Sequence, residues 1–377
     1  MPNARTGIAR LEEDLARQRA HLSGRCPPYA RALELLPEVL GGPAGRHLAA
    51  AWRHRRFHAW YDRPLLLLAA LRADARADGP LHPLYEGLAA SEPRADRVTP
   101  GALAAALDGR RERLFDALAH RAVQTNDTSR AVAWLWPAFL AGASGGRRPV
   151  ALADVGASAG LNLVADDLPA LWTFEDGRPV EVAWGIRAVA RLGLDREPLD
   201  ATSQAGADWL RACVWPGERD RAERLEAALS AFRAARPRPD APVLVPIAAR
   251  NVPARLDLLS AVQAGALVIA YQTVVRDYLD PEERDEYEAG MRTWVATHPP
   301  GHALWVELEG APDGAGWEQA AAIVVHARAP GGEVLRFALA RCAHKPTRLA
   351  RDPAAVQGFL AVFQGTGSRE HAAPAAP

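Results

Sequence analysis

The chain has 377 residues, of which 49% are hydrophobic and 24% charged, so it has the composition of a globular protein and room for two domains. Its 45 Lys and Arg residues balance 45 Asp and Glu residues, and a formal net charge of zero gives no sign of a nucleic-acid partner. The chain has three isolated cysteines, Cys26, Cys213 and Cys342. This number and spacing argue against a disulfide framework and a cysteine-rich zinc site, and favour a reducing compartment.

The N-terminal string MPNARTGIARLEEDLARQRAHL is charged and lacks the apolar core of a signal peptide. The longest apolar runs, such as RPLLLLAALRA, are much shorter than the roughly 18 residues that cross a bilayer. We therefore expect a soluble, cytoplasmic protein that contacts no membrane. The sequence does not indicate its oligomeric state.

Residues 1–148 are rich in Ala, Leu and Arg, and their apolar positions recur at helical spacing, as in IARLEEDLARQRAHL and RERLFDALAHRAV. Pro and Gly interrupt these stretches, and no strand pattern precedes residue 149. The sequence predicts an N-terminal helical region here, which would form a lid and the substrate side of a site. RHRRFH places His54 and His58 on one helix face, but its arginines would repel a cation, so we expect no metal site.

From residue 149 the pattern changes, and apolar strand-like runs alternate with helical stretches. This alternation predicts an α/β domain over residues 149–345, with a mostly parallel sheet wrapped by helices. The turn-rich link APGGEV predicts an antiparallel hairpin at the sheet edge. The predicted strands lie at 150–155, 188–194, 243–248, 266–274, 303–309, 320–327 and 334–341.

Three local patterns add detail. Asp280 as N-cap, Pro281 and Glu283 mark the beginning of a helix. LWTFEDGRPVEV carries an Asp-Gly turn between alternating residues and predicts an inserted hairpin. The tail, residues 366–377, has the composition of a disordered segment.

The string ALADVGASAGLNL, residues 151–163, permits three interpretations. As G-x-S-x-G it is a serine hydrolase's nucleophile elbow, with Ser158 as nucleophile and Asp277 with His326 or His344 as partners. That fold places several strands before the elbow, whereas the region before this one is helical. As a second interpretation, the glycines serve packing alone.

The third interpretation is a cofactor turn. The string lacks the G-K-[ST] of an ATP-binding loop, and Ser158 would crowd the pyrophosphate of a dinucleotide. S-adenosylmethionine has no phosphate, so a sharp glycine turn, a helix beginning near Leu161 and a carboxylate facing its amine would suffice. The residues of this predicted cofactor site are Asp154, Gly156, Ala157, Ser158, Gly160 and Asn162.

Four strings together resemble the bacterial domain-of-unknown-function family 2332. They are VQTNDTSR (123–130), DVGASAGLNL, RLGLDREPLD (191–200) and VWPGERDRAERLEAAL (214–229), in this order. The likeness extends from about residue 20 to about residue 345. Since the C-terminal part of the family is similar to Rossmann-like methyltransferases, the resemblance implies a fold more strongly than a reaction. Relatives commonly carry His in place of Gln272 and Trp in place of Arg276, so a catalytic role of that histidine would be lost here.

Other polar residues follow predicted strands or precede the motif. Asp195, with Asp200 behind it, is the candidate for the ribose hydroxyls, and a solvated turn acid is the alternative. Gln124 and Asn126 would lie over the cofactor, unless their segment only caps helices.

In YQTVVRDYL, the predicted catalytic residues Tyr271, Gln272 and Arg276 lie at a strand's carboxyl end, where ligands bind in open α/β sheets. Arg276 would bind a substrate anion or pair with Asp277. The leading hypothesis is an S-adenosylmethionine-dependent methyltransferase that acts on a small-molecule substrate. The alternatives are a serine hydrolase that uses Ser158 and a non-catalytic, methyltransferase-like protein that binds a metabolite or a partner.

Overall fold

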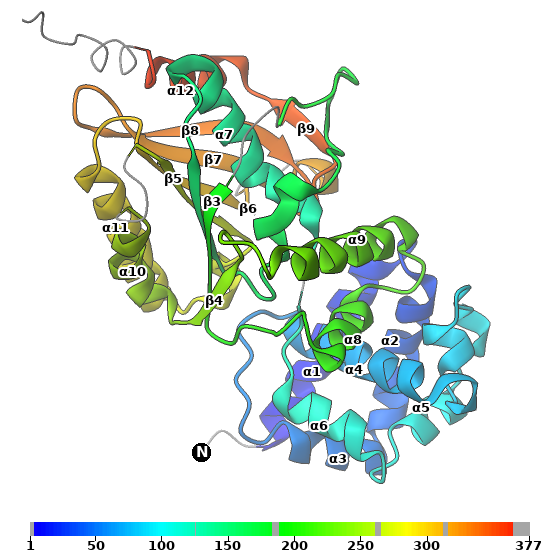
Figure 1. Cartoon of the computed structure of the whole chain (residues 1–377). Coiled ribbons are helices and arrows are strands. Elements are labelled where there is room, and N and C mark those ends of the chain that lie inside the picture. Colours follow the sequence, from blue (N-terminus) through cyan, green and yellow to red (C-terminus); the bar gives the residue numbers. More distant parts are fainter. Residues whose placement is uncertain (1–3, 125, 183–187, 261–264, 312–315, 365–377) are drawn as a thin grey trace, which may run out of the picture. The chain divides into compact units, whose positions relative to one another are not determined.

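The computed structural model describes residues 4–124, 126–182, 188–260, 265–311 and 316–364 (Figure 1). The chain forms two compact units. The first comprises residues 1–125 and 203–225, and the second comprises residues 126–202 and 226–377. The division therefore falls at residue 125 rather than 148, and the segment 203–225 belongs with the N-terminal helices. The predicted disordered tail lies outside the described residues.

The first unit is helical throughout its described residues. Helix α4 is at its centre, and the leucines Leu66, Leu67 and Leu68 on it are buried. Helix α8 follows strand β3 in the sequence but packs against α4, where Arg72 donates a hydrogen bond of 2.8 Å to the carbonyl of Arg211. The α-helices of this unit are α1 (Ala4–Leu22), α2 (Pro27–Leu40), α3 (Pro43–Ala51), α4 (Asp62–Asp78), α5 (Pro100–Ala106), α6 (Glu112–His120) and α8 (Gln204–Cys213).

One expectation about this unit is wrong. Helix α3 ends at Ala51, so His54 and His58 lie after the helix and not on a helical face. The chain turns here because Trp52 Nε1 and Arg55 Nη1 both donate to the carbonyl of Leu118, at 3.1 and 3.0 Å.

The described part of the second unit carries a nine-stranded sheet in the order β2-β9-β8-β7-β6-β5-β1-β3-β4. Strands β4, β3, β1, β5 and β6 are parallel, and β7 and β8 continue the sheet as an antiparallel hairpin. The predicted Rossmann-like α/β fold with an antiparallel hairpin is confirmed. The strands are β1 (Val150–Val155), β2 (Thr173–Phe174), β3 (Ala188–Asp195), β4 (Val243–Pro246), β5 (Leu267–Thr273), β6 (Ala303–Gly310), β7 (Ala321–Arg328), β8 (Val334–Cys342) and β9 (Arg348–Arg351).

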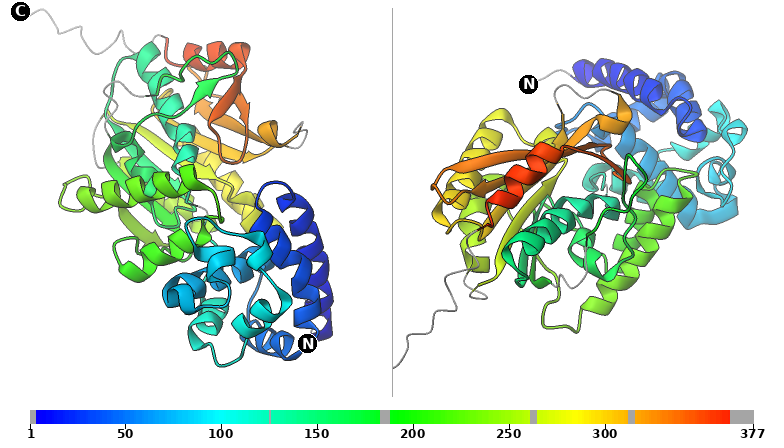
Figure 2. Two further views of the ribbon diagram at one scale, coloured as in Figure 1. Left: turned by 90° about the vertical axis from the view of Figure 1, so that its right-hand side faces the viewer. Right: turned by 90° about the horizontal axis from the view of Figure 1, so that it is seen from above.

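Helices cover both faces of this sheet (Figure 1). Helices α7 (Val132–Gly145) and α12 (Pro353–Ala361) pack on one face, and Figure 2 shows α12 lying across the antiparallel strands. Helices α10 (Val252–Ser260) and α11 (Pro281–Thr297) pack on the other. Side chains alternate along each strand, so Leu152 and Tyr271 face α7 while Ala153 and Ala270 face α10 and α11.

Two smaller predictions also hold. Helix α11 begins at Pro281, directly after Asp280, as predicted, but Glu283 does not cap it and instead pairs with Arg196 at 2.7 Å. Helix α9 (Arg219–Ala235) carries the chain across the division between the units. In the inserted hairpin, Val180 N–H donates to the carbonyl of Trp172 at 2.9 Å, and Gly177 forms the turn with a φ of 81°. None of the helices in the described residues has both the length and the apolar character that crossing a membrane requires.

The strand order defines where a ligand is expected. Strands β3 and β4 follow β1 on one side of it, and β5 and β6 follow on the other, so the chain reverses direction across the sheet between β1 and β5. Open α/β sheets bind ligands at the carboxyl ends of the two strands that flank such a reversal. Here Asp154 lies beside Tyr271, and Val155 lies beside Gln272.

Candidate functional site

The glycine turn after β1 needs its glycines for two reasons. Gly156 and Gly160 have φ values of 73° and 72°, a conformation that glycine adopts without strain. A Cβ atom on Gly156 would lie 2.6 Å from Val275 Cγ2, and one on Gly160 would lie 2.7 Å from Leu244 Cδ2. Both glycines therefore allow close packing as well as the turn itself.

Ser158 is held in this turn by two polar side chains. Its φ of 55° is unusual for a residue other than glycine. Asp195 accepts a hydrogen bond of 2.7 Å from the backbone N–H of Ser158 and one of 2.9 Å from that of Glu197. Asn126 Nδ2 donates to Ser158 Oγ at 2.6 Å. The structure thus brings the predicted residues Asn126, Ser158 and Asp195 together, with Asp195 bound to the turn backbone.

The helix that was expected to begin near Leu161 is not an α-helix, and that prediction is wrong. Residues Leu161–Asp167 form a 3₁₀ segment (η5) that is interrupted at Val164. Buried Arg191 causes the interruption, because it binds the Leu163 carbonyl and pairs with both oxygens of Asp166 at 2.6 and 2.7 Å. A segment this short and irregular does not supply a helix dipole for a ligand carboxylate.

Asp154 is the most unusual group at the end of β1. It is 2% exposed, and its Oδ2 has no hydrogen-bond partner among the described residues. The pKa of Asp154 is raised to about 8, mainly by burial; nearby Asp195 also raises it, whereas the Tyr271 hydroxyl and Arg130 lower it. Burial and Asp154 together raise the pKa of Tyr271 well above its ordinary value.

Polar atoms without partners also occur on neighbouring segments. The segments that carry them are η4 (Thr128–Ala131), β1, η5 and β5, and η4 packs against η5. A buried polar atom without a partner costs free energy, so several in one neighbourhood indicate a place for a polar ligand or water. Within the described chain, the buried atoms that lack a partner here are Ser129 Oγ, Asp154 Oδ2, Asn162 Oδ1 and Tyr271 Oη.

On the opposite face of the sheet, Gln272 is fully engaged. Its side-chain oxygen accepts hydrogen bonds from Tyr287 Oη at 2.6 Å and from Trp305 Nε1 at 3.0 Å, and its Nε2 donates to Glu309 at 2.8 Å. Gln272 is completely buried. These contacts give Gln272 a structural role and do not direct it toward a substrate.

Arg276 is held by carboxylates. It pairs with Glu288 at 2.8 Å and with Glu307 at 2.5 Å. The ion pairs found among the described residues do not include one between Arg276 and Asp277. The second oxygen of Glu307 lies 3.1 Å from Nε2 of His326, whose ring stacks on Trp305. The positive charge of Arg276 is therefore neutralised within the protein.

The remaining predicted residues have other surroundings. Gln124 belongs to the first unit, where its backbone hydrogen-bonds to the thiol of Cys213. Asp200 is exposed and accepts hydrogen bonds from Thr202. Ala157 is a buried part of the glycine turn.

The structure also reveals residues that the sequence analysis missed. Ser129 and Arg130 lie in the polar string VQTNDTSR, which supplies the recognisable signal. Glu307 and Glu309 lie two residues apart in the apolar run LWVELEG, a spacing that places both carboxylates on the same face of a buried strand.

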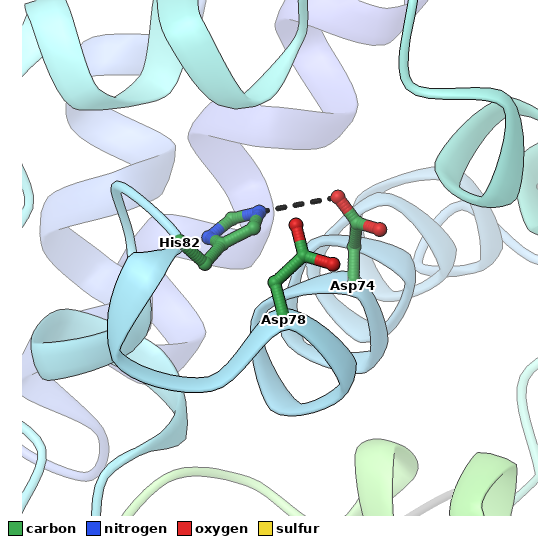
Figure 3. Close-up of side chains that lie close together, drawn as sticks. All are labelled: Asp74, Asp78 and His82. Atoms are coloured by element: carbon green, nitrogen blue, oxygen red, sulfur yellow. Dashed lines mark hydrogen bonds and ion pairs between the residues drawn. The ribbon is translucent and has the colours of Figure 1, made fainter.

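A group of metal-ligand residue types occurs in the first unit. Asp74, Asp78 and His82 lie close together, and His82 Nε2 is 3.1 Å from Asp74 (Figure 3). Nδ1 of His82 accepts a hydrogen bond from the Leu84 backbone, so Nε2 carries the ring proton of the neutral histidine and donates to Asp74. Nη1 of Arg111 lies 2.9 Å from both aspartates. The arginine thus supplies the positive charge that a metal ion would bring.

Comparison with known proteins gives one match. No curated protein and no solved structure matches the chain. The family described as "Uncharacterized protein conserved in bacteria (DUF2332)" matches residues 12–351, which confirms the predicted resemblance. The chain therefore belongs to this family.

Proposed function

We propose that the second unit is an S-adenosylmethionine-dependent, methyltransferase-like enzyme that acts on a small-molecule acceptor. The proposal depends on a single observation: the carboxylate of Asp154 is buried and incompletely hydrogen-bonded at the end of β1, beside the glycine turn. A buried carboxylate in this condition favours a cationic ligand group. S-adenosylmethionine carries an amine and a sulfonium and has no phosphate to crowd Ser158.

The residues at the site fit the cofactor. Asp154 would pair with the amine. Asp195 would reach the ribose hydroxyls, because each carboxylate oxygen that binds the turn backbone retains a second lone pair. Asn126 would fix the turn through Ser158.

When bound, the cofactor supplies an electrophilic methyl group on its sulfonium. The contribution of the protein is to hold the acceptor in line with that methyl group and to exclude water. The Tyr271 hydroxyl lies next to Asp154 and keeps its proton, because its pKa is raised well above the ordinary value, so it would orient the acceptor by donating a hydrogen bond to it.

Titration calorimetry of the whole chain with S-adenosylmethionine, S-adenosylhomocysteine and NAD tests the proposal. We expect the first two to bind. Asp154→Asn should weaken S-adenosylmethionine at least about tenfold, since it removes a buried charge partner. The matched control, Asp285→Asn, alters an exposed carboxylate of α11 and should change the affinity less than about twofold. Binding of NAD alone, or an Asp154→Asn variant with unchanged affinity, would overturn the proposal.

The positive φ of Ser158 also favours a second candidate, the serine hydrolase. A hydrolase needs a base that takes the hydroxyl proton, however, and Asn126 donates to Ser158 Oγ. The described residues before β1 also contain no strand. Covalent labelling of Ser158 by a fluorophosphonate would establish this candidate, and a lack of labelling would remove it.

A further inference from the structure

The turn after β5 is strained. Val274 has a φ of 58°, which a β-branched residue adopts only when its surroundings force it to. Its backbone N–H donates to the carbonyl of Leu308 on β6 at 2.9 Å. Ser158 and Val274 are the non-glycine residues with positive φ in the described chain, and they follow the two strands that flank the reversal.

Glu309 fixes the next residue of this turn. Its Oε1 accepts hydrogen bonds from the backbone N–H of Val275 at 2.9 Å and from Gln272 Nε2 at 2.8 Å. The residue is 4% exposed. One carboxylate oxygen on β6 therefore holds the last part of β5 and the turn that follows it.

The turn after β5 also supports the glycine turn that follows β1. The side chain of Val275 fills the space that a Cβ atom on Gly156 would occupy, at 2.6 Å. The position of Gly156 therefore depends on Val275, and the position of Val275 depends on Glu309.

We propose that Glu309 is a positioning residue, which fixes the turn after β5 and through Val275 fixes the glycine turn that follows Asp154. Its importance for ligand binding rests on the proposed function, whereas the coupling between the two turns does not. Glu309 acts through backbone geometry and not through contact with a ligand.

The charges around Glu309 supply a readout that a merely structural contact would lack. The pKa of Glu309 is raised to about 7, mainly by burial; Glu307 also raises it, and the hydrogen bonds from Val275 and Gln272 and the charge of Arg276 lower it. Tyr287 of α11 faces the same group. Because a solvated glutamate has a pKa of about 4.3, opening that exposes Glu309 should become about tenfold easier between pH 6 and pH 8.

Hydrogen exchange of the whole chain, corrected for the intrinsic rate at each pH, tests the proposal. Glu309→Ala removes both hydrogen bonds, and we expect peptides covering 150–165 and 268–280 to exchange about tenfold faster. Glu309→Gln keeps an acceptor oxygen without a charge. It should protect both peptides at pH 6 at least as well as wild type does, and it should lose the pH dependence.

Glu333→Gln, which changes an exposed glutamate of the same unit, is the matched control and should behave as wild type. Faster exchange of the β5 peptide alone in Glu309→Ala would overturn the coupling. So would a wild-type pH dependence in Glu309→Gln, which remains informative if the alanine variant does not fold. Calorimetry with S-adenosylmethionine separates the two proposals: if wild type does not bind it, the proposed function fails, while the exchange results still decide the role of Glu309.

Discussion

The two faces of the sheet treat their buried polar groups differently at the carboxyl ends of β1, β5 and β6. On the α7 face, Asp154 and Tyr271 each leave a polar atom without a partner among the described residues. On the α11 face, Gln272 uses both ends of its amide, and Glu307 binds Arg276 and His326.

This difference separates a structural network from a candidate binding site. A satisfied network makes the strand ends rigid, and removing any member leaves its neighbours unpaired. An unsatisfied buried carboxylate reduces the stability of the free protein, and a ligand that pairs with it restores what was lost. Three substitutions test whether the faces differ in this way.

The largest effect is expected on the α11 face. Glu307→Gln removes the carboxylate that Arg276 and His326 share, while Arg276 keeps Glu288. It should lower the free energy of unfolding by about 2 kcal/mol, less than for a fully buried pair because Arg276 is partly exposed. Urea denaturation at pH 7.5 measures this change. Glu333→Gln, an exposed control, should cost less than about 0.5 kcal/mol. A loss below about 1 kcal/mol for Glu307→Gln would show that the network contributes little.

On the α7 face, a substitution is expected to raise the free energy of unfolding instead of lowering it. The pKa of Asp154 is about 8 in the folded chain, above its unfolded value of about 3.9. The folded state therefore keeps a proton that the unfolded state has lost, and the free energy of unfolding falls as the pH rises from about 4 to about 8. Asp154→Asn mimics the neutral form and should therefore be more stable than wild type at pH 8.

Thermal unfolding of wild type and Asp154→Asn at several pH values checks this second prediction. The advantage of the variant should shrink steadily as the pH is lowered toward 4. A difference that stays constant across this range, or a variant that is less stable at pH 8, would contradict the assigned ionisation of Asp154.

The smallest effect concerns the turn that follows β5. Asparagine tolerates a positive φ better than alanine does, so Val274→Asn should be more stable than Val274→Ala by about 1 kcal/mol. Because the two variants lose the same valine contacts, their difference in midpoint temperature isolates the backbone strain. Equal midpoints would mean that the turn relaxes in both variants.

Much of the sheet was predictable from local pattern. Strand β1 has the predicted bounds, because a buried parallel strand appears in the sequence as an unbroken apolar run, here between Pro149 and Gly156. The positions of Asp154 and Tyr271 near the ends of β1 and β5 were predictable, since each stands near the end of such a run. The hydrogen-bond partner of Asp195 was not predictable, because the pairing of β1 with β3 is what brings Ser158 next to it.

The errors have a common physical cause, namely contacts between residues that are distant in the sequence. Leu161–Asp167 has an apolar pattern compatible with a helix, but Arg191 from β3 binds its carbonyl and carboxylate groups. The pairing of Arg276 with Glu307 depends on the neighbouring positions of β5 and β6. A local sequence pattern does not indicate how one strand is aligned with its neighbour in the sheet.

The segment Ser203–Leu225 has a consequence for how the protein can be divided. The chain passes from one unit to the other three times, and the helical unit is completed only after β3 has been made. A fragment that stops at residue 125 would lack α8, including its buried residues Trp209 and Leu210. The surface of α4 that α8 covers in the intact chain would then be exposed to water. The helical unit is consequently not a separable module, and its folding has to wait for the synthesis of more than two hundred residues.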